Sequence, residues 1–389
     1  MEKKPLEHNN NSKPKYQNIS KEDIVHDEEV AAIIHRIVSA PVVTNKMQKV
    51  YELKADISVN EMISLCDKMK KCFLESDVLL NIDSSSPICV VADLHGQAVH
   101  LLRILRTCGS PPAQRYIFLG DYVDRGSQGI LILCLLFCMK YRYPKHVYLL
   151  RGNHEDVNTT LNYGFYEECI QRFATTSDDL VTGEKVWRAC IETFNTMPLA
   201  ALLDKKIFCC HGGISPFMSS LQDIQKIERP LIIPPFGLAC DLLWSDPSNN
   251  GNEGWALSHR GISFTYGFDT AEEFCKKNNV HLIIRGHQLF RELYATGYVF
   301  RFGGILISLF SALNYENHRN NAAVIKINFK SSIEVTPIVF RCRHYVPQKP
   351  SETIGYKDWE YRQNAIKNKK DSVSISGNKS EKVRTRHDG

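Results

Sequence analysis

Short strands of branched and aromatic residues, each followed at once by a polar turn rich in Gly, Asp, Asn and His, constrain the fold of this chain more than any other feature. The first three strands are ICVV (88–91), YIFL (116–119) and HVYLL (146–150). Helical patterns over 97–108 and 128–141 separate them. A strand–helix–strand–helix–strand series is typical of a parallel sheet. The sequence therefore predicts an α/β protein.

Further strands follow with fewer helices between them, which predicts a second sheet. They are KIFCC (206–210), LIIR (282–285), ILISLF (305–310), AAVIKINF (322–329) and IVFRCR (338–343). Two helical patterns, 28–38 and 59–74, precede all the strands of the two sheets. In the second of them the apolar residues recur at helical spacing, as Met62, Leu65, Met69 and Phe73. We expect these two helices to form a cap on a two-sheet body.

Polar segments flank this body and divide the chain into three parts. Residues 1–27 contain hardly any apolar side chains, which predicts a flexible polar arm. The predicted catalytic domain spans 28–346, and residues 347–389 form a predicted disordered, basic tail. The net charge is +5, of which the segment 349–389 supplies +4, from ten basic and six acidic residues. The body therefore has no broad basic surface, and we expect no nucleic-acid partner.

Hydropathy argues against a membrane-spanning or secreted protein, and cysteine spacing argues against a thiolate phosphatase. The longest apolar run, 130–139, is about half of the roughly 20 residues that cross a bilayer, and the N-terminal residues are too polar for a signal peptide. We expect no membrane partner and a cytoplasmic and/or nuclear location. The 13 cysteines form no CxxC pair, and none has an arginine six residues after it, as a thiolate phosphatase loop requires. We therefore expect no nucleophilic thiol chemistry on phosphate.

Six of the predicted strands end in polar residues beside Gly or Asn. Ligands of open α/β sheets bind at the carboxyl ends of strands, where short loops hold side chains in place. Asp93 and His95 are two residues apart, so in an extended chain both point to one side, whereas the adjacent Asn153 and His154 point different ways. The polar residues at these ends include Asp93, His95, Asp121, Asp124, Arg125, Asn153, His154, His211, His287, Asn314 and Tyr315.

Six of these residues make a metal-ligand set of three His, two Asp and one Asn. Oxygen and imidazole ligands without thiolate suit Mn, Fe or Zn. Six are too many for one catalytic ion with open positions, so the set predicts two divalent ions that share a carboxylate. Such a pair lowers the pKa of bound water and serves in-line attack on phosphorus. The predicted ligands are Asp93, His95, Asp121, Asn153, His211 and His287.

The same residues lie in motifs that resemble the phosphoprotein phosphatase family of metal-dependent Ser/Thr protein phosphatases. The resemblance covers about residues 30–345, and YGFYEEC (163–169) and RGISFTYG (260–267) make the chain most similar to the type-1, protein phosphatase 1-like catalytic subunit, as a divergent member. It implies a metallophosphoesterase-like central two-sheet β-sandwich flanked by helices, with an N-terminal helical cap. The other motifs are DLHGQ (93–97), GDYVDRG (120–126), RGNHE (151–155), CCHGG (209–213), LLWSDP (242–247), RGHQ (285–288) and SALNY (311–315).

The resemblance implies a role for each motif residue. Asp93, His95 and Asp121 would hold one metal, and Asp121 would bridge to a second, held also by Asn153, His211 and His287. A hydroxide that bridges the two metals would attack phosphoserine or phosphothreonine directly. His154, oriented by Asp124, would protonate the leaving alkoxide. Arg125 and Arg260 would clamp the phosphoryl oxygens, and Asn153 and Tyr315 would line the substrate position.

The resemblance also implies partners and leaves two alternatives open. Phosphoprotein substrates and regulatory subunits are the expected partners. One alternative is a metallophosphoesterase that acts on nucleotides, because a dimetal core does not by itself select the substrate. The other is a catalytically weak binding protein that keeps the phosphatase fold. It is motivated by Ala92, Leu313 and Glu316, which stand where the family usually has Gly, Pro and Cys.

Overall fold

The protein is described by a computed structural model that covers residues 24–342, apart from 46–49, 84, 177–178, 249–250, 252 and 331. The predicted tail (347–389) lies outside the described residues, as do positions 1–23 of the predicted arm and 343–346 of the predicted domain. Of the predicted arm, residues 24–27 are described. Val25 donates its backbone N–H to the Arg142 carbonyl at 2.9 Å.

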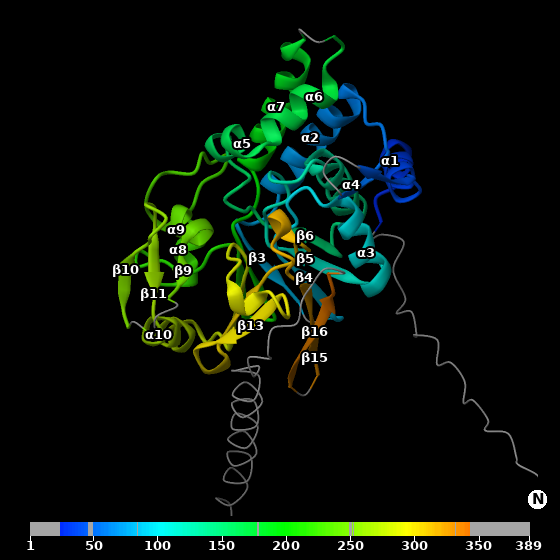
Figure 1. Ribbon diagram of the computed structural model, residues 1–389. Coiled ribbons are helices and arrows are strands. Elements are labelled where there is room, and N and C mark those ends of the chain that lie inside the picture. Colours follow the sequence, from blue (N-terminus) through cyan, green and yellow to red (C-terminus); the bar gives the residue numbers. More distant parts are fainter. Residues whose placement is uncertain are drawn as a thin grey trace, which may run out of the picture.

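Two large sheets pack face to face at the centre of the molecule (Figure 1). The five-stranded sheet has the order β16-β15-β4-β5-β6, and the six-stranded sheet has the order β13-β14-β12-β8-β7-β3. The strands of the first are β4 (Ile88–Val91), β5 (Arg115–Phe118), β6 (Val147–Leu149), β15 (Ala322–Phe329) and β16 (Ile333–Phe340). Those of the second are β3 (Leu79–Ile82), β7 (Ala200–Leu203), β8 (Ile207–Cys210), β12 (Leu282–Arg285), β13 (Tyr298–Arg301) and β14 (Leu306–Leu309).

Strand β4 shows why these short apolar runs form a sandwich. All four of its residues are buried. Ile88 and Val90 pack into the core between the two sheets, whereas Cys89 and Val91 pack against the helices on the outer face. Successive side chains of a strand point to opposite faces, so a strand covered on both sides needs an unbroken apolar run. The expected α/β sandwich with flanking helices is confirmed.

Helices cover both outer faces of the sandwich (Figure 1). The outer face of the five-stranded sheet shares a hydrophobic core with residues of α1 (Glu28–Val38), α2 (Val59–Leu74), α3 (Ala98–Cys108), α4 (Gly129–Arg142), α6 (Phe165–Phe173) and α7 (Leu180–Phe194), with α5 (Val157–Tyr163) beside them. The six-stranded sheet packs against α8 (Leu221–Gln225), α9 (Leu238–Trp244) and α10 (Phe268–Asn278). Within the described part of the chain, no helix combines the length and hydrophobicity needed to span a bilayer.

The predicted N-terminal cap is formed by α1 and α2, which pack on α4, with α2 also against α7. The four apolar residues expected on the inner face of α2 are all buried. Ser58 caps this helix, because its hydroxyl accepts the Glu61 N–H at 3.2 Å while the Glu61 carboxylate accepts the Ser58 N–H at 2.8 Å. Arg36 of α1 binds the same carboxylate through both guanidinium nitrogens, at 2.9 and 3.1 Å. One acidic side chain thus joins the two cap helices.

Replacing Glu61 with Gln is expected to lower the melting temperature at neutral pH by about 2 °C, from the loss of roughly 1 kcal/mol. Arg36 and the Ser58 hydrogen bonds lower the pKa of Glu61 to about 2, from an ordinary 4.5. A depressed carboxyl pKa stabilises the fold above pH 4.5, and this stability is lost as pH falls toward 2. The gap between wild type and variant should therefore narrow from pH 5 to pH 3 in thermal melts. Glu75→Gln, at the other end of α2, is the control; a gap that stays constant with pH would contradict this account.

Two small sheets and one misplaced boundary complete the fold. Strands β1 (Val42–Asn45) and β2 (Val50–Leu53) pair with each other, and β9 (Asp246–Pro247), β10 (Trp255–Leu257) and β11 (Phe264–Tyr266) form a three-stranded sheet. The last strand was expected at 338–343, but β16 begins at Ile333 and ends at Phe340. Pro337 lies within this strand. Proline is tolerated because β16 is an edge strand.

Candidate active site

The polar strand ends of both sheets meet at one edge of the sandwich. In the five-stranded sheet β4, β5 and β6 run parallel, and in the six-stranded sheet β8, β12 and β14 run parallel. Their carboxyl-terminal loops are joined across the two sheets. The His287 N–H after β12 donates to Asp93 after β4 at 3.0 Å, and the His211 ring after β8 bonds to the Leu119 carbonyl after β5 at 3.2 Å.

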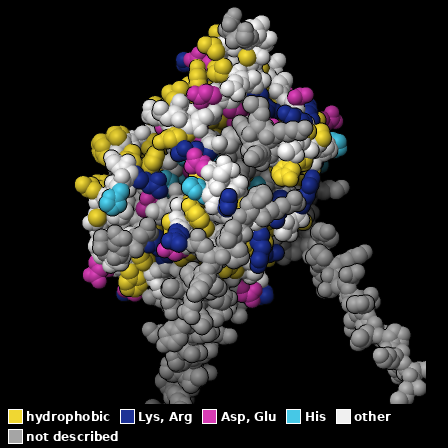
Figure 2. Space-filling model, viewed as in Figure 1, with side chains coloured by type: hydrophobic (Ala, Val, Ile, Leu, Met, Phe, Trp, Pro, Cys, Tyr) yellow, Lys and Arg dark blue, Asp and Glu magenta, His cyan; other side chains and the backbone are white. Residues whose placement is uncertain are grey.

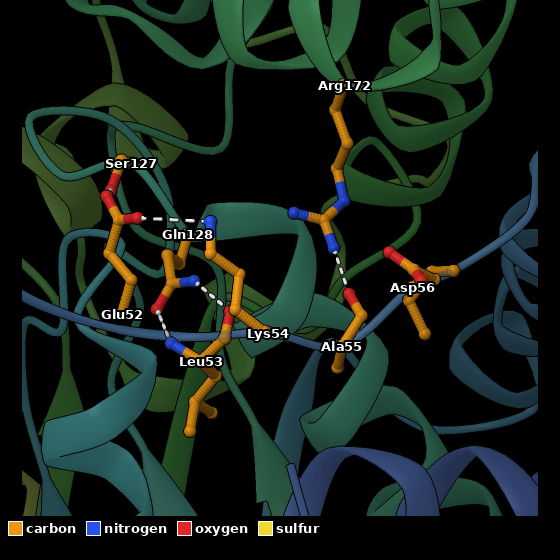
Figure 3. Close-up of a pocket in the computed structure, with 9 residues that line it drawn as sticks. Glu52, Leu53, Lys54, Ala55, Asp56, Ser127, Gln128 and Arg172 are labelled. Atoms are coloured by element: carbon orange, nitrogen blue, oxygen red, sulfur yellow. Dashed lines mark hydrogen bonds and ion pairs between the residues drawn. The ribbon is translucent and has the colours of Figure 1, made fainter. Parts of the chain in front are cut away.

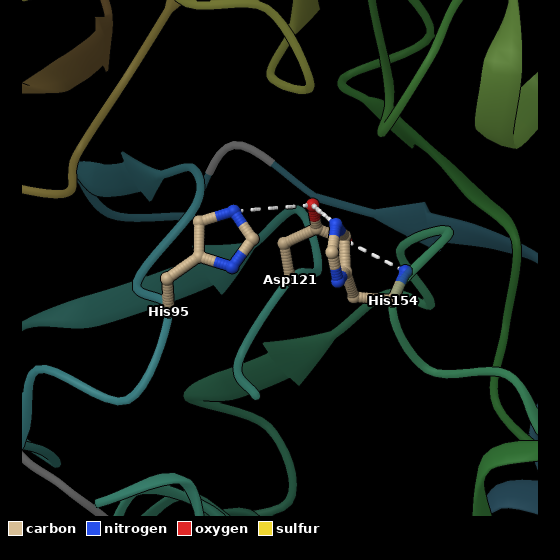
Figure 4. Close-up of side chains that lie close together, drawn as sticks. All are labelled: His95, Asp121 and His154. Atoms are coloured by element: carbon tan, nitrogen blue, oxygen red, sulfur yellow. Dashed lines mark hydrogen bonds and ion pairs between the residues drawn. The ribbon is translucent and has the colours of Figure 1, made fainter. Parts of the chain in front are cut away.

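Asp121 lies at the centre of the cluster. One of its carboxylate oxygens lies 3.5 Å from His95 Nε2 and the other lies 3.3 Å from His211 Nε2. Figure 4 shows His95 and His154 with the Asp121 carboxylate between them. Two groups of candidate metal ligands share this residue: His95, Asp121 and His154, and Asp121, His211 and His287; within each group the ligand atoms lie within 4.8 Å of one another.

The turn conformation of His95 corrects one step of the sequence reasoning. The spacing predicted that Asp93 and His95 face one side because the chain is extended. His95 instead has a φ of +43°, and Asp121 has a φ of +56°. Asp93 Oδ1 nevertheless lies 3.9 Å from His95 Nε2. Positive φ is costly for residues other than glycine and persists where the surrounding structure fixes it, so the turn, and not an extended strand, brings this pair together.

The hydrogen bonds of the histidine rings leave nitrogen lone pairs facing the acidic side chains. His95 Nδ1 donates to the Val123 carbonyl at 3.0 Å, and His211 Nδ1 donates to the Leu119 carbonyl. Because a carbonyl only accepts, the proton sits on Nδ1 in both rings. Nε2 of His95 is then free to bind a cation, and Nε2 of His211 faces the oxygens of Asn153 and Asp121. His287 Nε2 is buried and has no hydrogen-bond partner within the described structure. An orphaned ring nitrogen among carboxylates is what a metal ligand requires, so these residues fit the implied ions.

Burial and mutual charge set the protonation states of the cluster. Burial lowers the pKa of His95 to about 3, and it lowers the pKa of His287 well below its usual range. Burial also raises the pKa of Asp93 to about 6. For Asp121 burial acts in the same upward direction, but His211 and His154 outweigh it and hold the pKa below its ordinary value. His95 and His287 are therefore neutral imidazoles. Burial opposes protonation of His211 as well, but Asp121 outweighs it and raises the pKa of this ring, so His211 pairs with a carboxylate that stays ionised.

Glu155 is a site residue that the sequence reasoning missed. Its buried carboxylate accepts the backbone N–H groups of Asp121, Tyr122 and Gly152 at 2.8, 2.8 and 2.9 Å. Burial raises its pKa to about 7. These bonds fix the turn that aims Asp121, in the way that outer ligands position inner ones. The signal was present in the sequence, because Glu155 ends the RGNHE motif.

Asn153 and His154 point different ways, as their adjacency predicted. Asn153 Oδ1 lies 2.8 Å from His211 Nε2, inside the ligand cluster. His154 Nδ1 lies 2.7 Å from Asp124 Oδ2, and the other Asp124 oxygen accepts the Phe165 N–H. Burial opposes protonation of His154, but Asp121 and Asp124 outweigh it and raise its pKa. The structure thus holds a protonatable imidazole beside the cluster, with its free nitrogen directed toward Asp121 (Figure 4).

Arg260 lies on the β10–β11 side of the cluster and is held by Asp246. Asp246 Oδ2 lies 2.6 Å from Arg260 Nε, and its other oxygen lies 2.6 Å from Arg285 Nη2. The Arg260 guanidinium approaches the His287 carbonyl at 3.5 Å. Arg285 is fully buried and fixes the Asp246 carboxylate, which in turn holds Arg260. Sequence reasoning did not single out Asp246, although it lies in the LLWSDP motif.

Arg125 and Tyr315 lie on the other side of the cluster. The Arg125 guanidinium lies over the Tyr163 ring, 4.2 Å from its centroid, and the Arg125 N–H donates to the Tyr163 carbonyl at 3.0 Å. The Tyr315 ring lies 4.9 Å from the His95 ring. Tyr163, the last residue of α5, was not predicted as a site residue, although it begins the YGFYEEC motif. All the predicted site residues therefore lie in or beside one cluster.

The candidate site is separate from the pocket in Figure 3. That pocket has a volume of about 220 Å³ and is lined by residues 52–57, Ser127, Gln128 and Arg172, none of them a predicted site residue. Gln128 there bonds to both the N–H and the carbonyl of Leu53, at 2.9 and 2.8 Å. Figure 2 shows basic, acidic and His side chains close together near the centre of one face of the molecule, and exposed hydrophobic side chains on the side that carries β10 and β11.

Comparison with known proteins identifies this arrangement. Residues 86–290, more than half of the chain, match the sequence pattern of the calcineurin-like phosphoesterases. The chain belongs to this family. A protein serine/threonine phosphatase from Saccharomyces cerevisiae, described as similar to human phosphatase PP5, is 26% identical to this phosphoesterase, with a TM-score of 0.65, over 76% of this chain and 93% of that chain. The predicted resemblance to the phosphoprotein phosphatases is thereby confirmed.

A more distant structural likeness is to a cold-active protein-tyrosine phosphatase from a psychrophilic Shewanella species. It is 14% identical to this phosphoesterase, with a TM-score of 0.45, over 69% of this chain and 84% of that chain.

The matched region of the family, 86–290, contains all six predicted metal ligands and both arginines. Tyr315 and its loop lie beyond it. The chain is therefore a metal-dependent phosphoesterase by family, with a site that continues past the segment common to that family.

Proposed function

We propose that this phosphoesterase is a Ser/Thr protein phosphatase that removes phosphate from phosphoserine and phosphothreonine in proteins. The observation that carries the proposal is the placement of Arg125 and Arg260 on two sides of the His and Asp cluster, with the His154–Asp124 pair beside it. Two guanidinium groups suit a phosphate monoester, which presents three charged oxygens. The Saccharomyces phosphatase that resembles the chain supports the same substrate class.

Two divalent ions are part of the proposal, with Mn, or Fe and Zn, as the candidates. Asp93, His95 and Asp121 would hold one ion, and Asp121, Asn153, His211 and His287 the other. The orphaned His287 Nε2 and the Nδ1 protonation of His95 and His211 support this assignment. Ions bound there would lower the pKa of water and offset negative charge on phosphate.

The side chains of the protein supply binding and proton transfer. Arg125 and Arg260 bind phosphoryl oxygens and orient the ester, with Asn153 and Tyr315 beside them. His154 donates a proton to the departing serine or threonine oxygen, while Asp124 holds Nδ1 and stabilises the charged imidazole. The raised pKa of His154 keeps that proton available. Phosphoproteins are the substrates in this proposal, and regulatory subunits are its further partners.

Phosphate release from a phosphoserine peptide tests the proposal. The purified protein, loaded with Mn, should hydrolyse phosphoserine and phosphothreonine peptides at least ten times faster, in kcat/KM, than a bis-phosphodiester or a nucleotide. A chelator should abolish the activity, and added Mn should restore it. Comparable turnover of the diester or nucleotide would instead favour the nucleotide alternative, and metal-loaded protein without any turnover would favour the binding-protein alternative.

A further inference from the structure

Glu316 forms an ion pair with Arg125, one of the two arginines assigned to phosphate. Its Oε1 atom lies 3.1 Å from Arg125 Nη1, and both side chains are partly exposed. Stacking on Tyr163 holds the guanidinium from one side and Glu316 holds it from another. A carboxylate therefore already binds one of the donors that a substrate phosphate would use.

The backbone of its loop sets the position of Glu316. Glu316 lies in the 3₁₀ turn Tyr315–Asn317 after β14, and its own φ is +43°. Buried Asn320 holds this turn, since its Oδ1 accepts the Tyr315 N–H and its Nδ2 donates to the Ala312 carbonyl, both at 2.8 Å. Left-handed backbone outside glycine is kept only where such contacts fix it. Glu316 is thus presented at the site by a fixed loop.

Gln97 anchors the other end of the same loop. Its side-chain amide donates to the Leu313 carbonyl and accepts the Leu313 N–H, both at 2.9 Å, and Leu313 packs against the helical core. Leu313 therefore fills its position with a packed side chain and two satisfied backbone groups. With both ends of the loop fixed, the backbone holds Glu316 within reach of Arg125, and its partly exposed side chain can pair with Arg125 or with a cation of the substrate.

A fixed carboxylate beside the phosphate position acts on the residues next to a phosphorylated side chain. An acidic neighbour in the substrate brings a second negative charge toward Glu316, whereas a Lys or Arg neighbour pairs with Glu316 and leaves Arg125 free for the phosphoryl oxygens. Opposite charges a few ångströms apart at a surface attract, and like charges repel by similar amounts. The pair therefore discriminates between substrates by the charge that flanks the phosphoresidue.

We propose that Glu316 makes this phosphatase select phosphopeptides with Lys or Arg next to the phosphorylated residue. This inference rests on the proposed function and names the substrate class of the same site. Glu316 acts as a specificity-determining residue, through the substrate's flanking cation and through Arg125. It takes no part in proton transfer or in metal binding.

Three phosphoserine peptides that differ only in the residues flanking the phosphoserine, which are Arg, Ala or Glu, test the inference in the Mn-loaded full chain at low salt. For wild type, kcat/KM should fall in the order Arg, Ala, Glu, by about 5- to 10-fold from first to last. Glu316→Gln should reduce the difference to about 2-fold or less, and Glu316→Lys should reverse the order. The matched control is Glu167→Gln, which removes an exposed acid from the first turn of α6 and should keep the wild-type order.

A binding measurement separates this inference from the proposed function. Fluorescence anisotropy of the three labelled peptides with the Mn-loaded His154→Asn protein should show the tightest binding for the Arg-flanked peptide and the weakest for the Glu-flanked peptide. The double variant that carries His154→Asn and Glu316→Gln should show no such order. If no peptide is hydrolysed by wild type, the proposed function fails, and the binding order alone then decides the inference. Equal affinities, a preference for the Glu-flanked peptide, or an order that survives Glu316→Gln would overturn it. A preference that weakens between about 20 mM and 500 mM salt supports it, because surface charges are screened.

Discussion

Replacing His154 with Asn is expected to lower kcat for phosphoserine peptides by about 10²- to 10⁴-fold while leaving KM within about threefold. His154 is buried, its pKa is raised, and its Nδ1 is held 2.7 Å from Asp124. A serine alkoxide is a poor leaving group, so the loss of the proton donor acts mainly on kcat. Steady-state kinetics of wild type and variant, both loaded with Mn, give the result.

The leaving group provides the internal control. Because p-nitrophenolate leaves without help from a proton, the same variant should lose much less activity on p-nitrophenyl phosphate. Metal content must be measured in parallel, since His154 lies among the candidate ligands around Asp121. Equal losses on both substrates with full metal content would show that His154 organises the site and does not protonate the leaving group.

The sequence predicted most of the site because its signals are local. Each ligand lies within a few residues of the end of a short apolar strand, and parallel strands place their carboxyl ends at one edge. Strand β4 illustrates this, because its buried run ends at Val91 and Asp93 follows two residues later. Sequence could therefore predict which residues meet, even though it misjudged the backbone of His95.

The interactions that sequence could not predict join distant parts of the chain. Arg125 and Glu316 are 191 residues apart, and Arg260 depends on Asp246 in a different element. Arg125 is stacked on Tyr163, which no periodic pattern marks. Such pairs depend on how loops of two sheets meet, and no short-range spacing encodes that.

The structure accommodates Ala92, one of the departures from the family pattern, without strain. Ala92 stands where the family usually has Gly, which suggested strain beside Asp93. Ala92 is buried at the end of β4, is not among the described residues with positive φ, and donates its N–H to Ser311 Oγ at 2.9 Å. The position next to Asp93 that has no room for a side chain is Gly286, where a Cβ would lie 2.6 Å from an Asp93 oxygen. The methyl group of Ala92 therefore gives no support to the reading as a catalytically weak protein.

Asp121→Asn is the change expected to remove metal binding most completely. The Asp121 carboxylate is the member common to both candidate ligand groups, so its loss should lower affinity at both positions by more than the roughly 10- to 100-fold that loss of an outer partner costs. Elemental analysis after equilibration with Mn should find about two ions per wild-type chain and fewer than one per variant chain. Phosphatase activity of the variant should fall below detection.

Thermal melts decide whether such a loss is a metal effect or a folding effect. The Asn side chain keeps an oxygen that can accept the backbone N–H of His154, as Asp121 Oδ1 does at 3.0 Å. The metal-free variant should therefore melt within a few degrees of metal-free wild type. Ligand binding stabilises a fold by about 2.7 kcal/mol at 100 times Kd, so added Mn should raise the melting temperature of wild type and leave that of the variant unchanged. Asp241→Asn removes another buried carboxylate, which bonds to Ser215 and Ser263, and should retain the response to Mn. If the Asp121 variant still gains stability from Mn, the ions bind without a shared carboxylate. Asp93 would then have to be assigned as the central acidic ligand of the two-ion site in place of Asp121.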